Sequence, residues 1–202
     1  MRTKTATKTK VVAFSGSARK DGNTALLVKA VFAELEKAGV GTELVQLAGR
    51  PLRGCVACMR CFQRQDRRCA VSGDPVNSYI AKMLAADGVI LASPTYFADA
   101  SPEIMALVSR AGMTSRANGH MLRRKVGAAV VAVRRGGAVH AFDSLNHFFT
   151  ISQMIVVGSS YWNMGLGREK GDVLKDEEGM ETMRVLGQNM AWLLARLRAP
   201  VL

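Results

Sequence analysis

The sequence predicts an α/β protein in which helices cover both faces of a five-stranded parallel sheet. The chain has 202 residues, of which 49% are hydrophobic and 22% charged. These values suit one globular domain and exclude a disordered or fibrous chain. Five short apolar runs have the continuous hydrophobicity of buried strands. Segments with helical spacing follow them in alternation, and this order is typical of a parallel sheet wound on both faces.

The expected strands are short and bounded by polar or turn-forming residues. The run at 42–47 alternates between apolar and polar residues, whereas the others are continuously apolar and therefore predict strands buried on both faces. The five expected strands are residues 10–15, 42–47, 88–93, 126–133 and 154–158.

The expected helices are recognised by their boundaries and by their apolar stripes. Gly39 suits the end of the first helix, and Pro75 and Pro102 suit the first positions of the second and third. Acidic residues at 176–178 suit the positive end of the last helix dipole. The five expected helices are residues 27–38, 75–84, 102–111, 139–151 and 177–197.

The remaining segments predict the organisation of the chain. Residues 1–9 are basic and have no apolar pattern, so we expect a flexible tail before one domain at 10–202. Two connections, 48–73 and 112–125, are longer than usual, and long connections are often functional. No apolar run approaches the ~20 residues of a membrane-crossing helix, and none follows the basic start as a signal peptide would. We therefore expect a soluble, cytoplasmic protein.

The loop at 15–24 joins the first strand to the first helix and is suited to a phosphate. It offers hydroxyl, amide and guanidinium donors beside the positive end of a helix dipole. Its pattern is neither a Walker A loop nor G-x-G-x-x-G. A polar turn capped by Asn23 or Thr24 is the alternative. The candidate ligands are Ser15, Ser17, Arg19, Asn23 and Thr24.

Two further loops follow the third and fourth strands. In sheets of this class, ligands lie beyond the carboxyl ends of the strands where the strand order reverses. The first loop offers backbone N–H groups and two aromatic rings to a flat heterocycle, and the second offers paired glycines that permit close approach. A tight turn that only covers the sheet is the alternative for the first. The candidate residues are Pro94, Thr95, Tyr96, Phe97, Gly136 and Gly137.

Together the three loops resemble those of the flavodoxin-like flavoproteins, in particular the NADPH-dependent FMN reductases and iron–sulfur flavoproteins. The resemblance covers residues 10–198 and implies a flavodoxin-like fold that binds FMN. It places the FMN phosphate in the 15–24 loop and the isoalloxazine ring between the other two. The chemistry then takes place at flavin N5, and we assign no catalytic residue to the protein. The turn at 158–163, Trp162 included, and the three histidines receive no role.

All four cysteines of the chain lie in the first of the two long connections, at 48–73. With no secretory signal, they favour a metal site over a disulfide framework. Their order, Cys-x2-Cys-x2-Cys-x7-Cys, resembles the compact motif in which iron–sulfur flavoproteins hold a [4Fe–4S] cluster. A zinc ion and unligated thiols are the alternatives. Because this connection follows the second strand, we expect it at the same sheet edge as the flavin. The candidate ligands are Cys55, Cys58, Cys61 and Cys69.

The formal net charge of +12 is concentrated at 1–10, 50–69 and 110–135. Such an excess suits an anionic partner or a solvated basic surface. We expect an oxidoreductase that receives electrons from an acidic carrier such as ferredoxin. An NAD(P)H-dependent FMN or quinone reductase without a cluster is the alternative. A nucleic-acid-associated protein is a distant one, because no binding motif is present, so we expect no nucleic-acid partner. The resemblance also implies a homodimer or homotetramer.

Overall fold

The computed structural model describes residues 8–198. Most of the expected tail, residues 1–7, lies outside the described residues. Thr9 is held against the sheet, because its carbonyl accepts a hydrogen bond from the amide of Gly41 at 2.8 Å. Among the described helices, none combines the length and the apolar character needed to cross a membrane.

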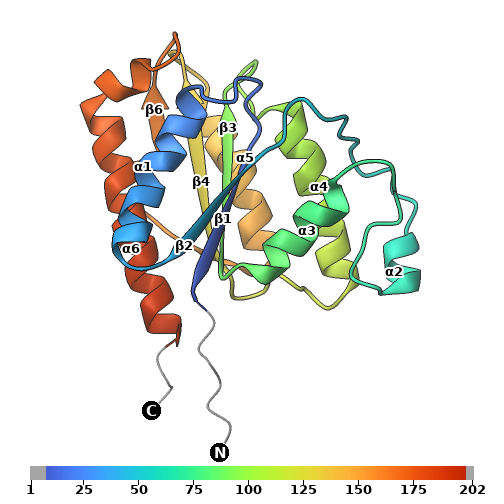
Figure 1. The fold of residues 1–202 in the computed structure, drawn as a ribbon. Coiled ribbons are helices and arrows are strands. Elements are labelled where there is room, and N and C mark those ends of the chain that lie inside the picture. The colour runs from blue at the N-terminus through green and yellow to red at the C-terminus, as the bar shows by residue number, and fades with distance from the viewer. Residues whose placement is uncertain (1–7, 199–202) are drawn as a thin grey trace, which may run out of the picture.

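A twisted parallel sheet forms the centre of the fold (Figure 1). Its strands run in the order β2-β1-β3-β4-β5, and every neighbouring pair is parallel. The order reverses between β1 and β3, so a crevice opens beyond their carboxyl ends. The expected fold class is thereby confirmed. The strands are β1 (Lys10–Ser15), β2 (Gly41–Gln46), β3 (Gly88–Pro94), β4 (Val126–Val133) and β5 (Ile155–Val156).

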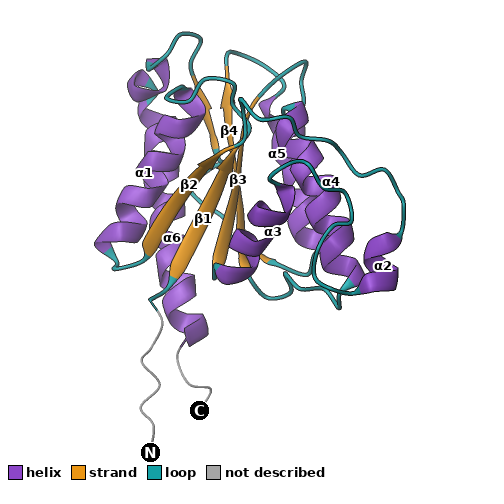
Figure 2. Ribbon diagram, turned by 45° about the vertical axis from the view of Figure 1, so that its right-hand side comes forward, coloured by secondary structure: helices purple, strands orange, loops and turns teal. Residues whose placement is uncertain are grey.

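Helices cover both faces of the sheet (Figure 2). Side chains alternate along β1, so that Val12 and Phe14 enter the core on one face while Val11 and Ala13 enter the core on the other. α1 and α6 pack on the second of these cores, and α3, α4 and α5 pack on the first. The five long helices are α1 (Asn23–Lys37), α3 (Val76–Ala85), α4 (Pro102–Ala117), α5 (Ala138–Ile151) and α6 (Glu177–Arg198).

Two short helical segments complete the described helices. α2 (Arg60–Arg64) lies within the cysteine-containing connection, and a 3-10 turn, η1 (Asp172–Lys175), precedes α6. Neither was expected from the sequence, because each is too short to show a helical period.

The prediction of a long connection at 112–125 was wrong in part. α4 continues to Ala117, so only residues 118–125 connect it to β4. The apolar stripe fades before the helix ends, because the buried positions of its last turns include the polar residues Thr114 and Ser115. Ser115 Oγ accepts a hydrogen bond from the amide of Leu122 at 3.2 Å and so closes the connection.

The fifth strand of the sheet is interrupted. β5 pairs with the first residues of β4, and a separate strand, β6 (Met164–Leu166), pairs with the last residues of β4. The turn at 158–163 is therefore an excursion part-way along the sheet edge. The sequence predicted that this turn would follow the carboxyl end of the fifth strand, and that prediction was wrong. The exposed rings of Tyr161 and Trp162 lie on the turn.

Asn163 returns the chain to the sheet after this excursion. Its side-chain amide donates to the carbonyl of Ala129 at 3.0 Å, and its own carbonyl accepts from the amide of Val131 at 2.9 Å. Asn163 is buried, so these bonds are protected from water. Because of this return, β6 and not β5 reaches the carboxyl edge of the sheet beside β4. The residues that follow β6 at this edge are Gly167 and Arg168.

Replacing Asn163 with Ala should lower the free energy of unfolding by about 1–3 kcal/mol, because the buried carbonyl of Ala129 loses its side-chain donor. Denaturant unfolding measures the change. Gln188→Ala is the matched control, since this amide makes only an exposed hydrogen bond to Glu34. An equal loss in both variants would show that Asn163 does not hold the interrupted strand.

Candidate functional site

The amino end of α1 is open to an anion. Its N-cap residue is Gly22, and no side chain in the described part of the chain caps the helix. The alternative in which Asn23 or Thr24 caps this helix is therefore wrong. The first hydrogen bond of the helix joins the amide of Leu26 to the carbonyl of Gly22, so the amides of residues 23–25 have no acceptor within the helix. The first turn carries no acidic residue, and its dipole favours a negative charge.

The loop before this helix is shaped by its own hydroxyl groups. Ser17 Oγ accepts a hydrogen bond from the amide of Arg19, and Ser15 Oγ accepts one from the amide of Ser17. Gly16 lets the loop pack against α4, because a Cβ there would lie 3.1 Å from Ile104 Cβ. Ser15 is fully buried beneath the loop. The structure therefore uses Ser15 to support the loop, while Ser17 also reaches the cavity described next.

A cavity of about 190 Å³ lies at the carboxyl edge of the sheet, where four loops meet. It brings together seven residues expected from the sequence, which are Ser17, Arg19, Asn23, Thr24, Pro94, Thr95 and Tyr96. It also includes Arg134, Gly167 and Arg168, which were not among the residues expected from the sequence. Of the residues from 8 to 198, none that lines the cavity is acidic, so the three guanidinium groups around it favour an anionic ligand.

Arg168 was missed because the strand that precedes it was missed. β6 has only three residues and shows no strand pattern. Asn23 fastens the 167–171 segment to α1, since its side-chain amide donates to the carbonyl of Glu169 at 2.9 Å and accepts from the amide of Gly171 at 2.8 Å. Asn23 therefore positions the fourth loop as well as lining the cavity.

The loops after β3 and β4 pack against each other beside this cavity. Gly137 has a φ of +87°, and a Cβ there would lie only 2.7 Å from Ala98 Cα. The loop after β3 folds into a tight turn in which the amide and carbonyl of Tyr96 pair with those of Asp99. Phe97 stands at the tip of this turn, fully exposed. Gly137 thus permits the close approach of the two loops, whereas a Cβ at Gly136 would meet nothing within 4 Å, and neither glycine is among the residues that line the cavity.

Thr95 carries an unpaired polar group at this place. Its hydroxyl oxygen is buried, and it has no hydrogen-bond partner within residues 8–198. Buried polar groups without a partner are uncommon and ask for an explanation. A polar group of a ligand in the adjoining cavity would provide one.

The four cysteines meet around a second, smaller cavity of about 20 Å³ along α4. Cys61 is buried, Cys69 is half-buried, and Cys55 and Cys58 are exposed. Burial raises the pKa of the Cys61 thiol. In the part of the chain that the structure describes, no three His, Cys, Asp or Glu side chains are placed to hold a single metal ion.

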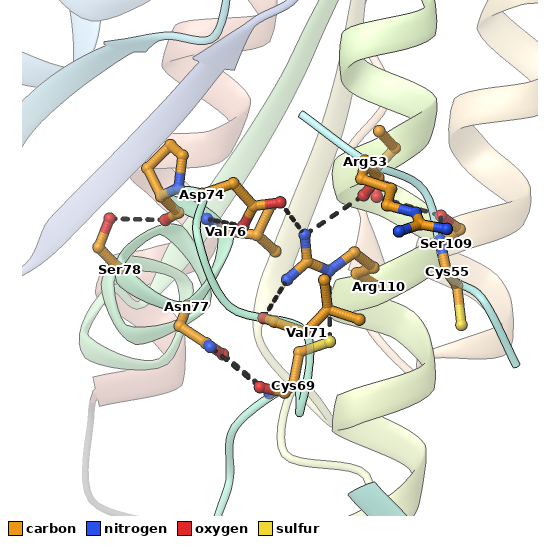
Figure 3. Close-up of polar contacts among 12 residues, drawn as sticks. Arg53, Cys55, Cys69, Val71, Asp74, Val76, Asn77, Ser78, Ser109 and Arg110 are labelled. Atoms are coloured by element: carbon orange, nitrogen blue, oxygen red, sulfur yellow. Dashed lines mark hydrogen bonds and ion pairs between the residues drawn. The ribbon is translucent and has the colours of Figure 1, made fainter. Parts of the chain in front are cut away.

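Arg110 of α4 holds the cysteine-containing connection from both ends (Figure 3). Its guanidinium forms an ion pair with Asp74 and donates to the carbonyls of Arg53 at 3.3 Å and Val71 at 2.8 Å. Its Nε also donates to Cys69 Sγ at 3.3 Å. The side chain is fully buried. Burial opposes the charged form, but the hydrogen bonds to Asp74 and Cys69 raise the pKa of Arg110 above its ordinary value.

The expectation that the cysteines lie at the flavin edge of the sheet was wrong. α4 begins at that edge, where Ser101 and Ile104 adjoin the 15–24 loop. The cysteine cavity is lined by Arg110 and Thr114 of the same helix. At ~1.5 Å per residue, these two residues lie roughly 14–20 Å from Ser101 along the helix axis. The connection leaves β2 and runs down the outer side of α4, because Arg110 and Asn118 bind its backbone there.

Comparison with known proteins identifies the family. The profile of the family described as NADPH-dependent FMN reductase matches residues 9–169. The chain belongs to this family. An iron–sulfur flavoprotein of Methanocaldococcus jannaschii is 38% identical over 189 residues, covering 90% of this chain and 95% of the relative. An iron–sulfur flavoprotein of Methanosarcina thermophila is 31% identical, covering 86% and 89% of the two chains.

Solved structures of flavoproteins share the fold of this FMN reductase family member. RosB, solved with a bound riboflavin-5'-phosphate derivative, aligns with a TM-score of 0.75 at 16% identity, covering 94% of this chain and 80% of RosB. A WrbA-like flavodoxin from Agrobacterium tumefaciens aligns with a TM-score of 0.64 at 16% identity, covering 94% and 98%. The chain is accordingly an FMN-dependent oxidoreductase with a flavodoxin-like fold.

Replacing Arg168 with Ala should weaken FMN binding about tenfold to a hundredfold, the effect of one charge-assisted hydrogen bond of roughly 1.5–3 kcal/mol. Riboflavin binding should change little, because riboflavin lacks the phosphate. Fluorescence titration measures both affinities. Lys170→Ala is the control, as a nearby cation outside the cavity. Equal weakening of both ligands by Arg168→Ala would contradict a phosphate contact.

Proposed function

We propose that this protein is an iron–sulfur flavoprotein that transfers electrons between an acidic carrier such as ferredoxin and an acceptor, through a [4Fe–4S] cluster and FMN. The observation that carries the proposal is the convergence of Cys55, Cys58, Cys61 and Cys69 on one cavity. The identity to iron–sulfur flavoproteins along nearly the whole chain supports it.

The FMN phosphate is proposed to lie at the amino end of α1. Ser17 and Thr24 would donate hydroxyl groups there, and Arg19, Arg134 and Arg168 would supply positive charge. Ser15 and Asn23 act mainly by holding the surrounding loops, through the hydrogen bonds given above. The free amides at residues 23–25 complete a donor set that suits a phosphate dianion.

The isoalloxazine ring is proposed to lie beside the 94–97 and 136–137 loops. Pro94, Thr95 and Tyr96 line the cavity, and the exposed ring of Phe97 extends this surface outward. The unpaired Thr95 hydroxyl would donate to a polar atom of the cofactor. When bound, the flavin exchanges electrons or hydride at N5, so the protein's part is to bind and orient it.

The cysteine cavity fits a multi-iron cluster better than a single ion. A zinc ion needs ligands at ~2.0–2.3 Å in a tetrahedron, and the described side chains offer no such group. A [4Fe–4S] cluster takes its ligands from four thiolates, and four cysteines line this cavity. Arg110 already donates to one of these sulfurs, and a buried positive charge offsets the negative charge that four thiolates concentrate.

The separation between the two proposed cofactors along α4 favours electron transfer between subunits. The homodimer or homotetramer that the resemblance implies would bring one subunit's cysteines toward the flavin of another. This assembly stays a prediction. NAD(P)H as the direct donor, without a cluster, is the second candidate function, and the description of the matched family supports it.

Anaerobic reconstitution with iron and sulfide should yield about four of each per chain, as expected for one [4Fe–4S] cluster. Cys58→Ala should abolish the iron-dependent absorbance yet retain FMN, because the flavin loops are separate from the cysteines. Ser72→Ala, an exposed change in the same connection, is the control. Stoichiometric zinc without sulfide would refute the cluster, and the absence of any bound metal would favour the NAD(P)H-dependent reductase.

Electron transfer from reduced ferredoxin should slow as salt rises from about 0.05 to 0.5 M, because screening shortens the reach of exposed charges. The exposed arginines of the cysteine connection are the proposed contact, and they are Arg53, Arg60, Arg64, Arg67 and Arg68. Arg64→Glu should lower the rate at low salt more than Lys29→Glu, which changes an exposed charge on α1. A rate that is independent of salt would leave these arginines as a solvated surface.

A further inference from the structure

We propose that the hydroxyl group of Thr114 donates a hydrogen bond to a sulfur atom of the iron–sulfur cluster and thereby raises the reduction potential of the cluster. Thr114 would act beside Arg110, whose Nε donates to Cys69 Sγ. This inference rests on the proposed function, since it concerns the same cysteine cavity.

Thr114 holds a polar group that the protein itself leaves unused. The side chain is 1% exposed, and its hydroxyl oxygen has no hydrogen-bond partner anywhere in residues 8–198. Threonine in a helix commonly donates to the carbonyl one turn before it. Thr114 does not bond to the carbonyl of Arg110, so a partner outside the helix is needed to satisfy it.

The cysteine cavity is where that partner would lie. Thr114 lines this cavity together with all four cysteines. Arg110 also lines it and precedes Thr114 by four residues on α4, so the two side chains stand one above the other on the same face of the helix. Arg110 and Thr114 thus place two side chains with donor groups, from consecutive turns of α4, along the cavity that the four cysteines line.

A hydroxyl donor at this position would affect the two oxidation states of the cluster unequally. Reduction adds an electron and increases the negative charge on the sulfurs. A hydrogen bond to sulfur stabilises the more negative state more strongly, and hydrogen bonds to the sulfurs are among the factors that set cluster potentials. The effect is strong in a buried site because water does not screen it.

The test compares Thr114→Val with Thr114→Ser in the reconstituted full chain. Valine keeps the shape of threonine but removes the hydroxyl, whereas serine keeps the hydroxyl. We expect the midpoint potential of the Val variant, measured by anaerobic titration of the cluster absorbance, to be lower than that of the wild type. The Ser variant should lie closer to the wild type. Thr182→Val is the control, because Thr182 is equally buried but lies on α6, beside Ser160.

The melting temperature of the cluster-free chain provides a second measurement. Without a cluster, the Thr114 hydroxyl is buried and unpaired, so Thr114→Val should leave the melting temperature unchanged or raise it. A lower melting temperature would show that the hydroxyl has a partner in the protein and would overturn the proposal. Equal midpoint potentials in the Val variant and the wild type would also overturn it. If the wild type takes up no iron and sulfide, the proposed cluster itself fails, and the inference fails with it.

Discussion

The buried guanidinium of Arg110 is the interaction on which the arrangement of the cysteines depends. Burying a charge costs several kcal/mol per ion unless it is paired and hydrogen-bonded. Asp74 supplies the opposite charge, and the carbonyls of Arg53 and Val71 and the sulfur of Cys69 accept further hydrogen bonds. These partners lie before the first cysteine and after the last. The cysteine-containing connection buries few apolar side chains. It is therefore held as a closed loop by one side chain of α4.

α4 also relates the two proposed cofactor sites to each other. Its first turn supports the 15–24 loop, the proposed phosphate site, because Gly16 packs against Ile104 there. Its second half carries Arg110 and Thr114 at the cysteine cavity. One rigid helix therefore sets the distance between the sites, and this distance cannot shorten without unfolding the helix. Within one chain the cysteines and the proposed flavin loops remain apart. This separation is the structural reason to expect that the cysteines of one subunit approach the flavin of another.

Much of the fold and part of the site follow from local sequence patterns. Continuous apolar runs predict β1, β3 and β4 because these strands are buried on both faces. The segments at the carboxyl ends of β1 and β3 supply the seven cavity residues that the sequence predicted. Arg168 escaped prediction because its place depends on Asn163, a single residue that restores the sheet after an excursion. Arg110 and Thr114 escaped because a buried arginine and a buried threonine look like surface residues in a helical sequence. Their roles come from contacts with residues distant in the chain.

Backbone strain is concentrated at the two places where the cofactors are proposed to bind. Nine non-glycine residues among those described have positive φ, and six of them lie in the two proposed cofactor loops, at Ala57, Met59, Gln65 and Arg67 in one and at Phe97 and Ala98 in the other. Such conformations persist only when the surroundings enforce them. Arg110 enforces the first loop through its four partners, and the second is held where Gly137 packs against Ala98. The fold thus holds both loops in shapes that their own residues disfavour, as expected of loops whose backbone must face a ligand.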